Sequence, residues 1–420
     1  PVKAHQKKGV PVPAHQHYNV TYGIIADQKE TLRIQPDENT AVQWIPVEQL
    51  PEIYKEPHML PVYEKVIHRM RRWKTMQEQA LLQTAQPLLA WYPLHARDLP
   101  WRHTKEPYRI WLSEIMLQQT RVEAVKNYYA QFLETFPDIA ALAAAEQDQV
   151  NKCWEGLGYY SRAANLRKAA QTIQEQYGGV FPRTWEEVRG LAGVGDYTAG
   201  AVCSICYGLP TPAVDGNVLR VAARVMNHFC EIDRPEQKAA VTALLRQVYL
   251  DNPEHCGTLT QAFMEIGATV CVPNGQPHCE VCPLSELCLG RQYCDALRLP
   301  QRTAKKARRQ EQYTVFVLQC DGKFALRKRT AKVLLHGLWE YPNVAGICTA
   351  EEAIAQASAW HCKPTDLTQT VERKHIFTHV EWELYGVYLT CARQDEQFVW
   401  KTAAEITKEI SLPTAFRQFF

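Results

Sequence analysis

Residues 191–200 read LAGVGDYTAG, in which two glycines are separated by one residue and followed at once by an apolar run. The pair Gly193 and Gly195 predicts a tight turn, and the apolar run predicts a helix that begins at this turn. Backbone N–H groups at such a helix start point outward and can bind a phosphate. A glycine pair alone is equally typical of an ordinary turn between two helices, so the surrounding sequence has to decide.

The sequence on both sides of the turn is typical of a helical domain. Apolar residues recur at spacings of three and four, as at Ile115, Val122, Val125 and Tyr129, which indicates helices with one buried face. A part of this length can bury its own core, so we predict an all-α domain over residues 76–299. The expected helices cover residues 77–91, 107–136, 147–156, 163–177, 237–250 and 259–270.

Two acidic residues in this domain have mostly apolar neighbours. Glu114 interrupts the run WLSEIMLQQT (111–120), and Asp215 lies between an apolar run and a glycine in PAVDGN (212–217). Charged side chains are rarely buried without a partner or a purpose. Taken alone, each acid is more often a surface or helix-capping group than a catalytic one.

Four of the 14 cysteines crowd into one short segment: Cys271, Cys279, Cys282 and Cys288. In a chain without an export signal, such a crowd indicates a metal site rather than disulfides. Four thiolates suit an iron–sulfur cluster or a structural zinc ion, and four unrelated thiols are the less favoured interpretation. Cys203 and Cys206 also form a C-x-x-C pair, but within an apolar helical run, where we expect two small buried residues.

The two ends of the chain differ from the helical part. Residues 1–75 are rich in proline and include a basic amphipathic stretch over 61–73, and residues 300–312 are polar and basic, as in a linker. An α+β domain is predicted for residues 313–420, because strand-like runs at 313–319, 324–327 and 382–390 accompany a helix near 350–360.

Composition argues against a membrane protein and leaves nucleic-acid binding open. The formal net charge is +2 and 46% of the residues are hydrophobic, which is ordinary for a globular protein. No stretch approaches the roughly 18 consecutive apolar residues of a membrane-spanning helix, and no signal peptide opens the chain, so a cytoplasmic protein is expected. Basic residues group at 69–74 and 302–309, and such local patches matter more for phosphate binding than the net charge.

Together, these motifs follow the order of one known family. From about Leu88 to Cys288 the chain resembles the helix-hairpin-helix family of endonuclease III and the adenine DNA glycosylases. The resemblance rests on DLPWR (98–102), the Glu114 run, WEGLGYYSR (154–162), the glycine turn, Asp215 and the four cysteines. The runs LSEIMLQQT and WEGLGYYSR are similar to the adenine glycosylase branch, as is Tyr197, which stands where bifunctional relatives carry a lysine.

One departure concerns the cysteines. The family spacing is C-x6-C-x2-C-x5-C, whereas the first gap here, residues 272–278, holds seven residues. A loop can absorb one residue without moving the ligands, so the assignment is kept. The shape of the adjoining DNA-contacting loop stays open.

The resemblance implies a monofunctional enzyme that removes adenine paired with 8-oxoguanine or guanine in double-stranded DNA. It implies a [4Fe–4S] cluster on the four cysteines, and a monomer is expected.

In the family pattern Glu114 protonates N7 of adenine, Asp215 stabilises or captures the sugar cation, and Tyr197 and Asn217 hydrogen-bond into this centre. Gln119, Leu157 and Tyr159 would enter the base stack, and Glu265 would read the adenine edge. The full set of implied DNA contacts is Arg102, Gln119, Thr120, Leu157, Tyr159, Gly193, Gly195 and Glu265.

The C-terminal region resembles the Nudix-like domain that this branch uses to recognise 8-oxoguanine. The magnesium-binding box REUxEE is absent after GLWEYP (337–342), so this domain is expected to bind rather than hydrolyse. Phe377, Thr378 and His379 match the family's Phe-Ser-His loop with Thr for Ser; without the resemblance, a strand end with a solvent-facing histidine would be favoured. Residues 31–53 resemble part of a second Nudix domain without its catalytic box, and no hydrolase activity is expected there.

Two other functions stay open at this point. A bifunctional endonuclease III-like lyase acting on oxidised pyrimidines would need a lysine where Tyr197 stands, because an amine has to attack the sugar. A DNA-binding module without enzymatic activity would keep the glycine turn and the cysteines. Such a module would have no reason to retain both Glu114 and Asp215.

Overall fold

The computed structural model describes residues 5–7, 10–12, 43–53, 59–303, 307–330 and 333–420. At the N-terminus these include a hairpin of β1 (His5–Lys7) and β2 (Val10–Val12), and then η1 (Val47–Gln49) and α1 (Leu50–Ile53). Most of the predicted N-terminal Nudix-like segment lies outside the described residues. No helix in the described part of the chain is long and apolar enough to cross a membrane.

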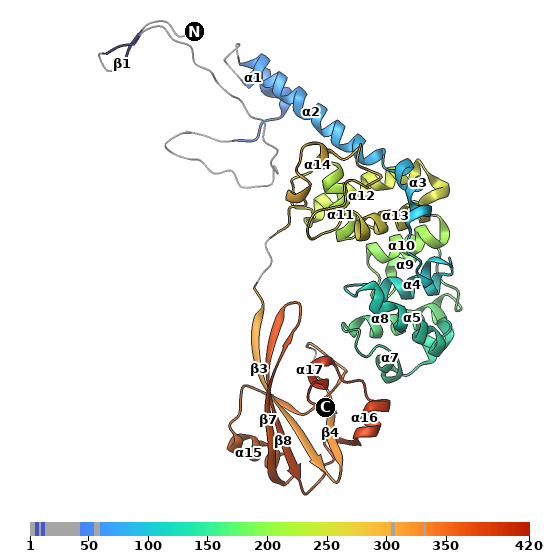
Figure 1. Ribbon diagram of the computed structural model, residues 1–420, viewed down its shortest axis with the longest axis vertical. Coiled ribbons are helices and arrows are strands. Elements are labelled where there is room, and N and C mark those ends of the chain that lie inside the picture. Colours follow the sequence, from blue (N-terminus) through green and yellow to red (C-terminus); the bar gives the residue numbers. More distant parts are fainter. Residues whose placement is uncertain (1–4, 8–9, 13–42, 54–58, 304–306, 331–332) are drawn as a thin grey trace.

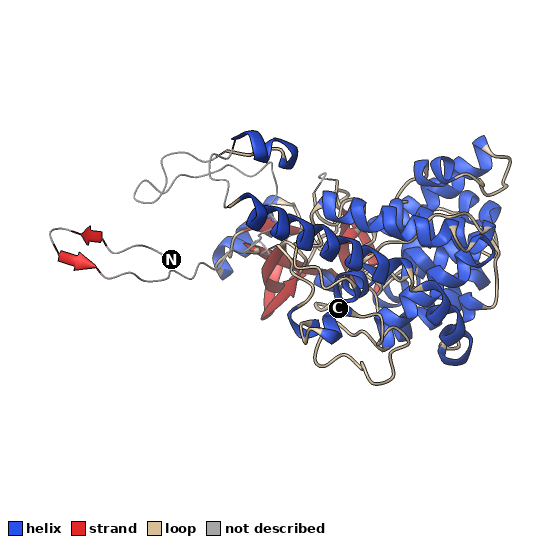
Figure 2. Ribbon diagram, turned by 90° about the horizontal axis from the view of Figure 1, so that it is seen from above, coloured by secondary structure: helices blue, strands red, loops and turns tan. Residues whose placement is uncertain are grey.

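The predicted all-α domain is present as a column of helices that α2 joins from the N-terminal side (Figure 1). Its helices are α2 (Leu60–Leu82), α3 (Ala85–His95), α4 (Pro107–Met116), α5 (Val122–Thr135), α6 (Ile139–Ala144), α7 (Gln147–Cys153), α8 (Ser161–Gln176), α9 (Trp185–Gly190), α10 (Asp196–Tyr207), α11 (Gly216–Val225), α12 (Pro235–Leu250), α13 (Cys256–Thr269) and α14 (Leu289–Gln292). From above, these helices make up most of the molecule, and the strands of the C-terminal sheet are grouped together (Figure 2).

Two buried clusters form the core of this domain. One gathers side chains such as Trp111, Phe132 and Trp154, and the other includes Leu88 and Phe263. Each cluster is the core of one half of the domain. Helix α10 lies between these two halves, because it packs against α4 from the half around Trp111 and against α13 from the half around Phe263. Elements from both halves therefore meet around the start of α10.

Two predicted boundaries differ from the structure. A boundary at residue 75 would cut α2, which is continuous over Leu60–Leu82, and the Gln77 amide donates a hydrogen bond of 2.8 Å to Met226 O in the helical domain. The predicted linker 300–312 is shorter, because strand β3 already begins at Arg309 and pairs from there with β8.

The single helix expected over 107–136 is two helices, α4 and α5, separated by residues 117–121.

The C-terminal domain is built on a mixed sheet of order β5-β4-β3-β8-β7, in which β6 also pairs with β3 and β9 with β4. Long strands β3 and β8 run parallel, and the other pairs are antiparallel. The elements are β3 (Arg309–Cys320), β4 (Lys323–Lys328), β5 (Trp339–Glu340), β6 (Asn343–Ala345), α15 (Ala350–Ala359), β7 (Pro364–Ile376), β8 (Val380–Cys391), β9 (Val399–Thr402), α16 (Ala403–Glu409) and α17 (Thr414–Arg417).

Both faces of this sheet are covered. Side chains alternate along a strand, and accordingly Val315 and Val317 of β3 join a cluster with Phe416 of α17, whereas Phe316 and Leu318 join a cluster with Ala357 of α15. The predicted α+β domain is thus present, with helices on both sides of a mixed sheet.

Candidate active site

A cleft of about 740 Å³ opens where the two halves of the helical domain meet. It is lined by the end of α4 and the loop after it, by the glycine turn with the start of α10, and by the start of α11. Eight of the twelve residues predicted to be catalytic or to contact DNA lie here. The lining consists of Glu114, Leu117, Gln118, Gln119, Thr120, Arg121, Gly193, Gly195, Tyr197, Thr198, Asp215 and Asn217.

Glu114 is the buried acid of the cleft, with only 5% of its surface exposed. Burial raises its pKa to about 7, and the negative charge of Asp215 adds to the shift, while a hydrogen bond from Tyr197 and the charge of Arg102 oppose it in part. Among the described residues, Oε2 of Glu114 has no hydrogen-bond partner. A carboxyl group with such a pKa still carries its proton in part of the molecules at neutral pH and can donate it to a bound base.

Asp215 is the N-cap residue of α11. Its Oδ1 accepts hydrogen bonds of 2.8 Å from the backbone N–H groups of Asn217 and Val218, and its Oδ2 accepts one of 2.8 Å from the Asn217 side chain. The position at a helix start also favours negative charge. The carboxylate is thereby fixed in orientation, and Asn217 holds it from the side. Arg220 in turn donates to Asn217 Oδ1 at 2.9 Å.

Tyr197 lies in the first turn of α10, beside both acids. Burial, followed by the negative charges of Glu114 and Asp215, raises the pKa of Tyr197 well above its usual value. The hydroxyl therefore keeps its proton and acts as a hydrogen-bond donor. It also contacts Met264 Sδ at 3.8 Å.

The glycine turn adopts the geometry that the sequence predicts. Gly193 has a φ of 74°, and Gly195 is the N-cap residue of the 12-residue helix α10. A Cβ atom at Gly193 would lie 2.6 Å from Cβ of Asn165, so a side chain is excluded there by space as well as by conformation. The helix start offers backbone N–H groups beside the two acids.

Two loops flank the cleft and carry residues in the left-handed conformation. Gln119 has a φ of 56° and is exposed, and Tyr159 has a φ of 48° and is 47% exposed. Such values are uncommon for residues other than glycine and cost energy that the surroundings have to supply. The Gln119 side chain lines the cleft, and the Tyr159 hydroxyl reaches Thr378 of the C-terminal domain.

A buried arginine that the sequence analysis did not single out holds both loops. Arg162 donates from Nη1 to the carbonyl oxygens of Ile115, Met116 and Gln118 at 2.7–2.9 Å. Its Nη2 donates to the carbonyl oxygens of Leu157 and Gly158 at 3.2 and 3.1 Å and to Thr120 Oγ1 at 3.3 Å. The sequence signal that could have found it is an arginine that closes the run WEGLGYYSR, shortly after the glycines Gly156 and Gly158.

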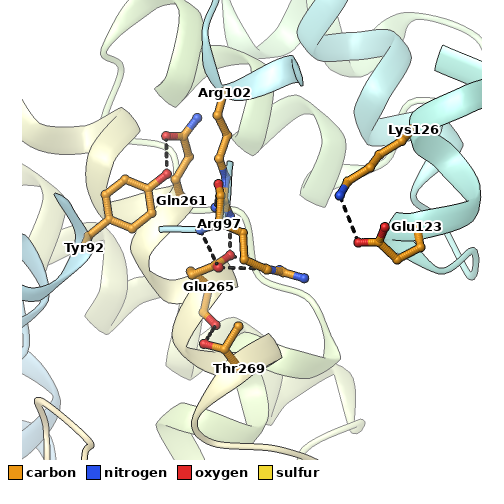
Figure 3. A network of polar contacts seen from close by, with 8 residues as sticks. All are labelled: Tyr92, Arg97, Arg102, Glu123, Lys126, Gln261, Glu265 and Thr269. Atoms are coloured by element: carbon orange, nitrogen blue, oxygen red, sulfur yellow. Dashed lines mark hydrogen bonds and ion pairs between the residues drawn. The ribbon is translucent and has the colours of Figure 1, made fainter. Parts of the chain in front are cut away.

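Three predicted DNA contacts lie elsewhere than expected. Leu157 is only 8% exposed and packs in the core. Glu265 is fully buried and bound by two arginines, as Figure 3 shows: Arg97 Nε donates to Oε1 at 2.7 Å, and Arg102 Nη2 binds Oε2. In this arrangement, therefore, Glu265 does not face the cleft and Arg102 is turned inward.

The charges explain this ion-paired cluster. Burial alone would raise the pKa of Glu265, but hydrogen bonds and charge from Arg97 and Arg102 outweigh it and hold the pKa at about 2. A carboxylate with this pKa stays ionised, so it is a structural anchor for residues 97–102. Direct reading of adenine by Glu265 would require its carboxylate to leave these two arginines, and it stays a prediction.

The four crowded cysteines line a common pocket behind α11, together with Arg224. Arg224 Nη1 donates to Cys271 Sγ at 3.2 Å, so a positive charge lies beside this cysteine. No group of three or more His, Cys, Asp or Glu side chains in the described ranges is arranged to hold a single metal ion. Cys203 and Cys206 instead pack in α10, as expected.

The predicted lesion loop joins β7 to β8. Phe377 packs against Trp382 with ring centroids 4.9 Å apart, and this contact anchors the loop in the domain core. Thr378 and His379 are exposed. The hydroxyl groups of Thr378 and Tyr159 share a hydrogen bond of 2.9 Å, so this loop lies at one of the two loops that flank the cleft.

Comparison with known proteins agrees with this architecture. Residues 112–247 match the HhH-GPD superfamily of base excision DNA repair proteins, and residues 314–420 match the NUDIX domain. Human adenine DNA glycosylase is 34% identical over 364 residues, which cover 72% of this chain and 66% of the relative. The mouse enzyme is 33% identical over 362 residues, covering 72% and 70%.

Among solved structures, the chain is similar to a thermostable thymine-DNA glycosylase at 26% identity, with a TM-score of 0.46 over 53% of this chain and 99% of that one. The chain spans about two thirds of the length of the mammalian relatives it matches. Sequence identity across both the helical and the Nudix-like parts leads to one conclusion: the chain belongs to the adenine DNA glycosylase family of helix-hairpin-helix base excision DNA repair proteins.

Proposed function

We propose that this chain is a monofunctional adenine DNA glycosylase that hydrolyses the N-glycosidic bond of adenine paired with 8-oxoguanine or guanine. The observation that carries the proposal is the pair of acids in one cleft, with different environments. Glu114 is buried with a raised pKa, whereas Asp215 is fixed as a helix cap. The cleavage of a glycosidic bond requires one carboxyl group that donates a proton and a second one that stabilises positive charge, and these two environments suit the two roles.

The first step is the extrusion of adenine from the duplex into the cleft, since its bond to the sugar is out of reach within the base stack. Gln119 and Tyr159 project beside the cleft and fill the space that adenine leaves. The backbone N–H groups of the glycine turn bind a DNA phosphate. Leu157 supports this surface from within, in keeping with its burial.

In the chemical step Glu114 donates its proton to N7 of adenine, so that the base leaves as a neutral molecule. The sugar passes through an oxocarbenium-like state, and the Asp215 carboxylate stabilises its positive charge. Water then adds to C1′ and gives an abasic site. Tyr197 and Asn217 orient the two acids by hydrogen bonds.

The reaction stops at the abasic site. Strand cleavage by β-elimination needs an amine that forms an imine with the sugar, and none of the described residues that line the cleft is a lysine. Tyr197 can donate a hydrogen bond but cannot form an imine. This favours a monofunctional enzyme over the lyase alternative.

We assign the pocket of Cys271, Cys279, Cys282 and Cys288 to a [4Fe–4S] cluster. Bound there, the cluster would cross-link the segment from Cys271 to Cys288 and shape it for contact with DNA. Arg224 and Arg220, which donate to Cys271 Sγ and Cys271 O, hold the first ligand in place. The chain is proposed to act as a monomer on double-stranded DNA, and Thr378 and His379 are proposed to contact 8-oxoguanine.

The test uses a labelled duplex with adenine opposite 8-oxoguanine. The product should be an intact strand with an abasic site that breaks only after alkali or heat, and borohydride should trap little covalent complex. A duplex with an oxidised pyrimidine opposite guanine serves as the control substrate and should stay unchanged. Efficient strand cleavage without alkali would favour the lyase alternative, and binding without any excision would favour a DNA-binding module.

A further inference from the structure

The C-terminal domain contacts the helical domain at the base of the turn that carries Tyr159, and the side chain at the centre of this contact is Glu155. Its carboxylate is only 12% exposed. Oε2 accepts a hydrogen bond of 2.7 Å from Lys152 Nζ, whereas Oε1 accepts one of 3.1 Å from the backbone N–H of Leu412 in the C-terminal domain. Arg417 Nη1 lies 3.9 Å from the same Oε1.

Neighbouring contacts make this a continuous seam. Lys152 Nζ also donates to Ile410 O at 3.0 Å, and Ser411 Oγ donates to Asn151 O at 3.0 Å. Ile410, Ser411 and Leu412 are buried. The segment 410–412 is therefore fastened to α7 and to the turn after it by hydrogen bonds in both directions.

Glu155 is at the same time the first residue of the turn that leads to Tyr159. Its carbonyl oxygen accepts a hydrogen bond of 2.7 Å from the Tyr128 hydroxyl, and Gly156 follows with a φ of 99°. The other end of the turn is held by Arg162, which binds the carbonyl oxygens of Leu157 and Gly158. The base of the turn is thus bound from the C-terminal domain, and its tip reaches the same domain through the hydrogen bond to Thr378.

Resting on the proposed function, we infer that Glu155 is a positioning residue that couples lesion recognition to base extrusion. It fixes the turn relative to the C-terminal domain, so that Tyr159 meets the Thr378 loop in one geometry. When that loop binds 8-oxoguanine, Tyr159 is held where it has to enter the base stack. Glu155 itself touches neither DNA nor the reacting atoms.

The experiment measures single-turnover excision by the full chain on two duplexes, with adenine opposite 8-oxoguanine and opposite guanine. Glu155→Ala should lower the ratio of the 8-oxoguanine rate to the guanine rate about tenfold, which corresponds to about 1.4 kcal/mol. Only the rate on the 8-oxoguanine duplex should fall, and the rate on the guanine duplex should stay the same. Glu155→Gln keeps an oxygen for the N–H of Leu412 and should retain the ratio within about twofold, because the neutral acceptor is preserved. Glu123→Ala removes an exposed ion pair with Lys126 on α5 and should leave both rates unchanged.

A second variant separates coupling from a general structural defect. In Thr378→Val the tip contact is already lost, so adding Glu155→Ala should lower the ratio no further. Equal losses on both duplexes in Glu155→Ala, or additive losses in the double variant, would overturn the inference. Should Glu155→Ala fail to fold, Lys152→Met removes the bridge to Ile410 O and has to give the same fall in the ratio.

A readout without catalysis distinguishes this inference from the proposed function. Hydrogen exchange of residues 155–160 in the free protein should be faster in Glu155→Ala than in the wild type, because the base of the turn is released. Unchanged exchange would refute the positioning role even where the enzyme prefers 8-oxoguanine. A wild type without any such preference would instead refute the lesion-reading part of the proposed function.

Discussion

Replacing Glu114 with glutamine should slow excision by orders of magnitude and, at alkaline pH, make the protein more stable. In the folded protein burial raises the pKa of Glu114 to about 7, from a value of 4.5 for the free side chain. A carboxyl group whose pKa is raised on folding costs no stability below its unfolded value, because it is protonated in both states. The cost grows as the pH rises between the two values and is complete above the folded value.

The magnitude follows from the difference between the two values. One pKa unit is worth about 1.36 kcal/mol, so ionised Glu114 destabilises the fold by on the order of 3 kcal/mol above pH 7 and by less than about 1 kcal/mol at pH 5. Glutamine has nearly the same shape and no charge, so it avoids this cost. Excision should fall by about 10²–10⁴-fold, the usual contribution of a general acid.

The assay compares thermal melting of the wild type and Glu114→Gln between pH 5 and 8.5. With about 2–4 °C for each kcal/mol in a domain of this size, the variant should melt about 6–12 °C higher at pH 8, and the gap should shrink towards pH 5. Glu123→Gln, at a side chain that is 79% exposed, is the control and should show no such gap. A gap that does not depend on pH, or a less stable variant at pH 8, would refute the argument.

Three further predictions concern the cleft and the cysteines. The single-turnover excision rate of the wild type should fall as the pH rises through about 7, because the acid form of Glu114 disappears; a flat profile up to pH 8.5 would contradict its role as acid. Asp215→Asn should abolish excision but shift the melting temperature by no more than about 2–4 °C, because asparagine caps a helix as well as aspartate; rates near those of the wild type would exclude a role in stabilising the sugar cation. Iron analysis should find about four iron atoms for each chain in yellow-brown protein, as a [4Fe–4S] cluster requires; an active, colourless preparation with stoichiometric zinc would contradict the cluster.

Much of the helical domain could be predicted from the sequence because its helices are amphipathic, but the breaks between helices could not. The apolar period continues through residues 107–136, yet α4 ends at Met116. The chain turns there because Arg162, far along the sequence, binds the carbonyl oxygens of Ile115, Met116 and Gln118. A pattern of apolar residues carries no information on such a contact.

In the candidate site, too, local features could be predicted from the sequence and long-range contacts could not. Short motifs that form within one turn, such as the glycine pair and the Asp215 cap, could be located from the sequence because their partners are neighbours in the chain. The family resemblance implies DNA contacts for Glu265 and Arg102, and nothing in the sequence near either residue points to the other. Their mutual ion pair spans 163 positions in the chain and depends on the packing of α13 against residues 97–102, so only the structure shows it.

The guanidinium of Arg162 joins the two loops beside the cleft into one scaffold. Because it binds the backbone on both sides of this scaffold from inside the protein, the exposed side chain of Gln119 is not needed to maintain the loop. Tyr159 differs, because its ring lies 5.5 Å from the Arg162 guanidinium and its hydroxyl shares a hydrogen bond with Thr378. Protein engineers can therefore vary position 119 in combinatorial libraries, with asparagine and glycine preferred where the left-handed backbone is kept, while position 159 keeps its tyrosine.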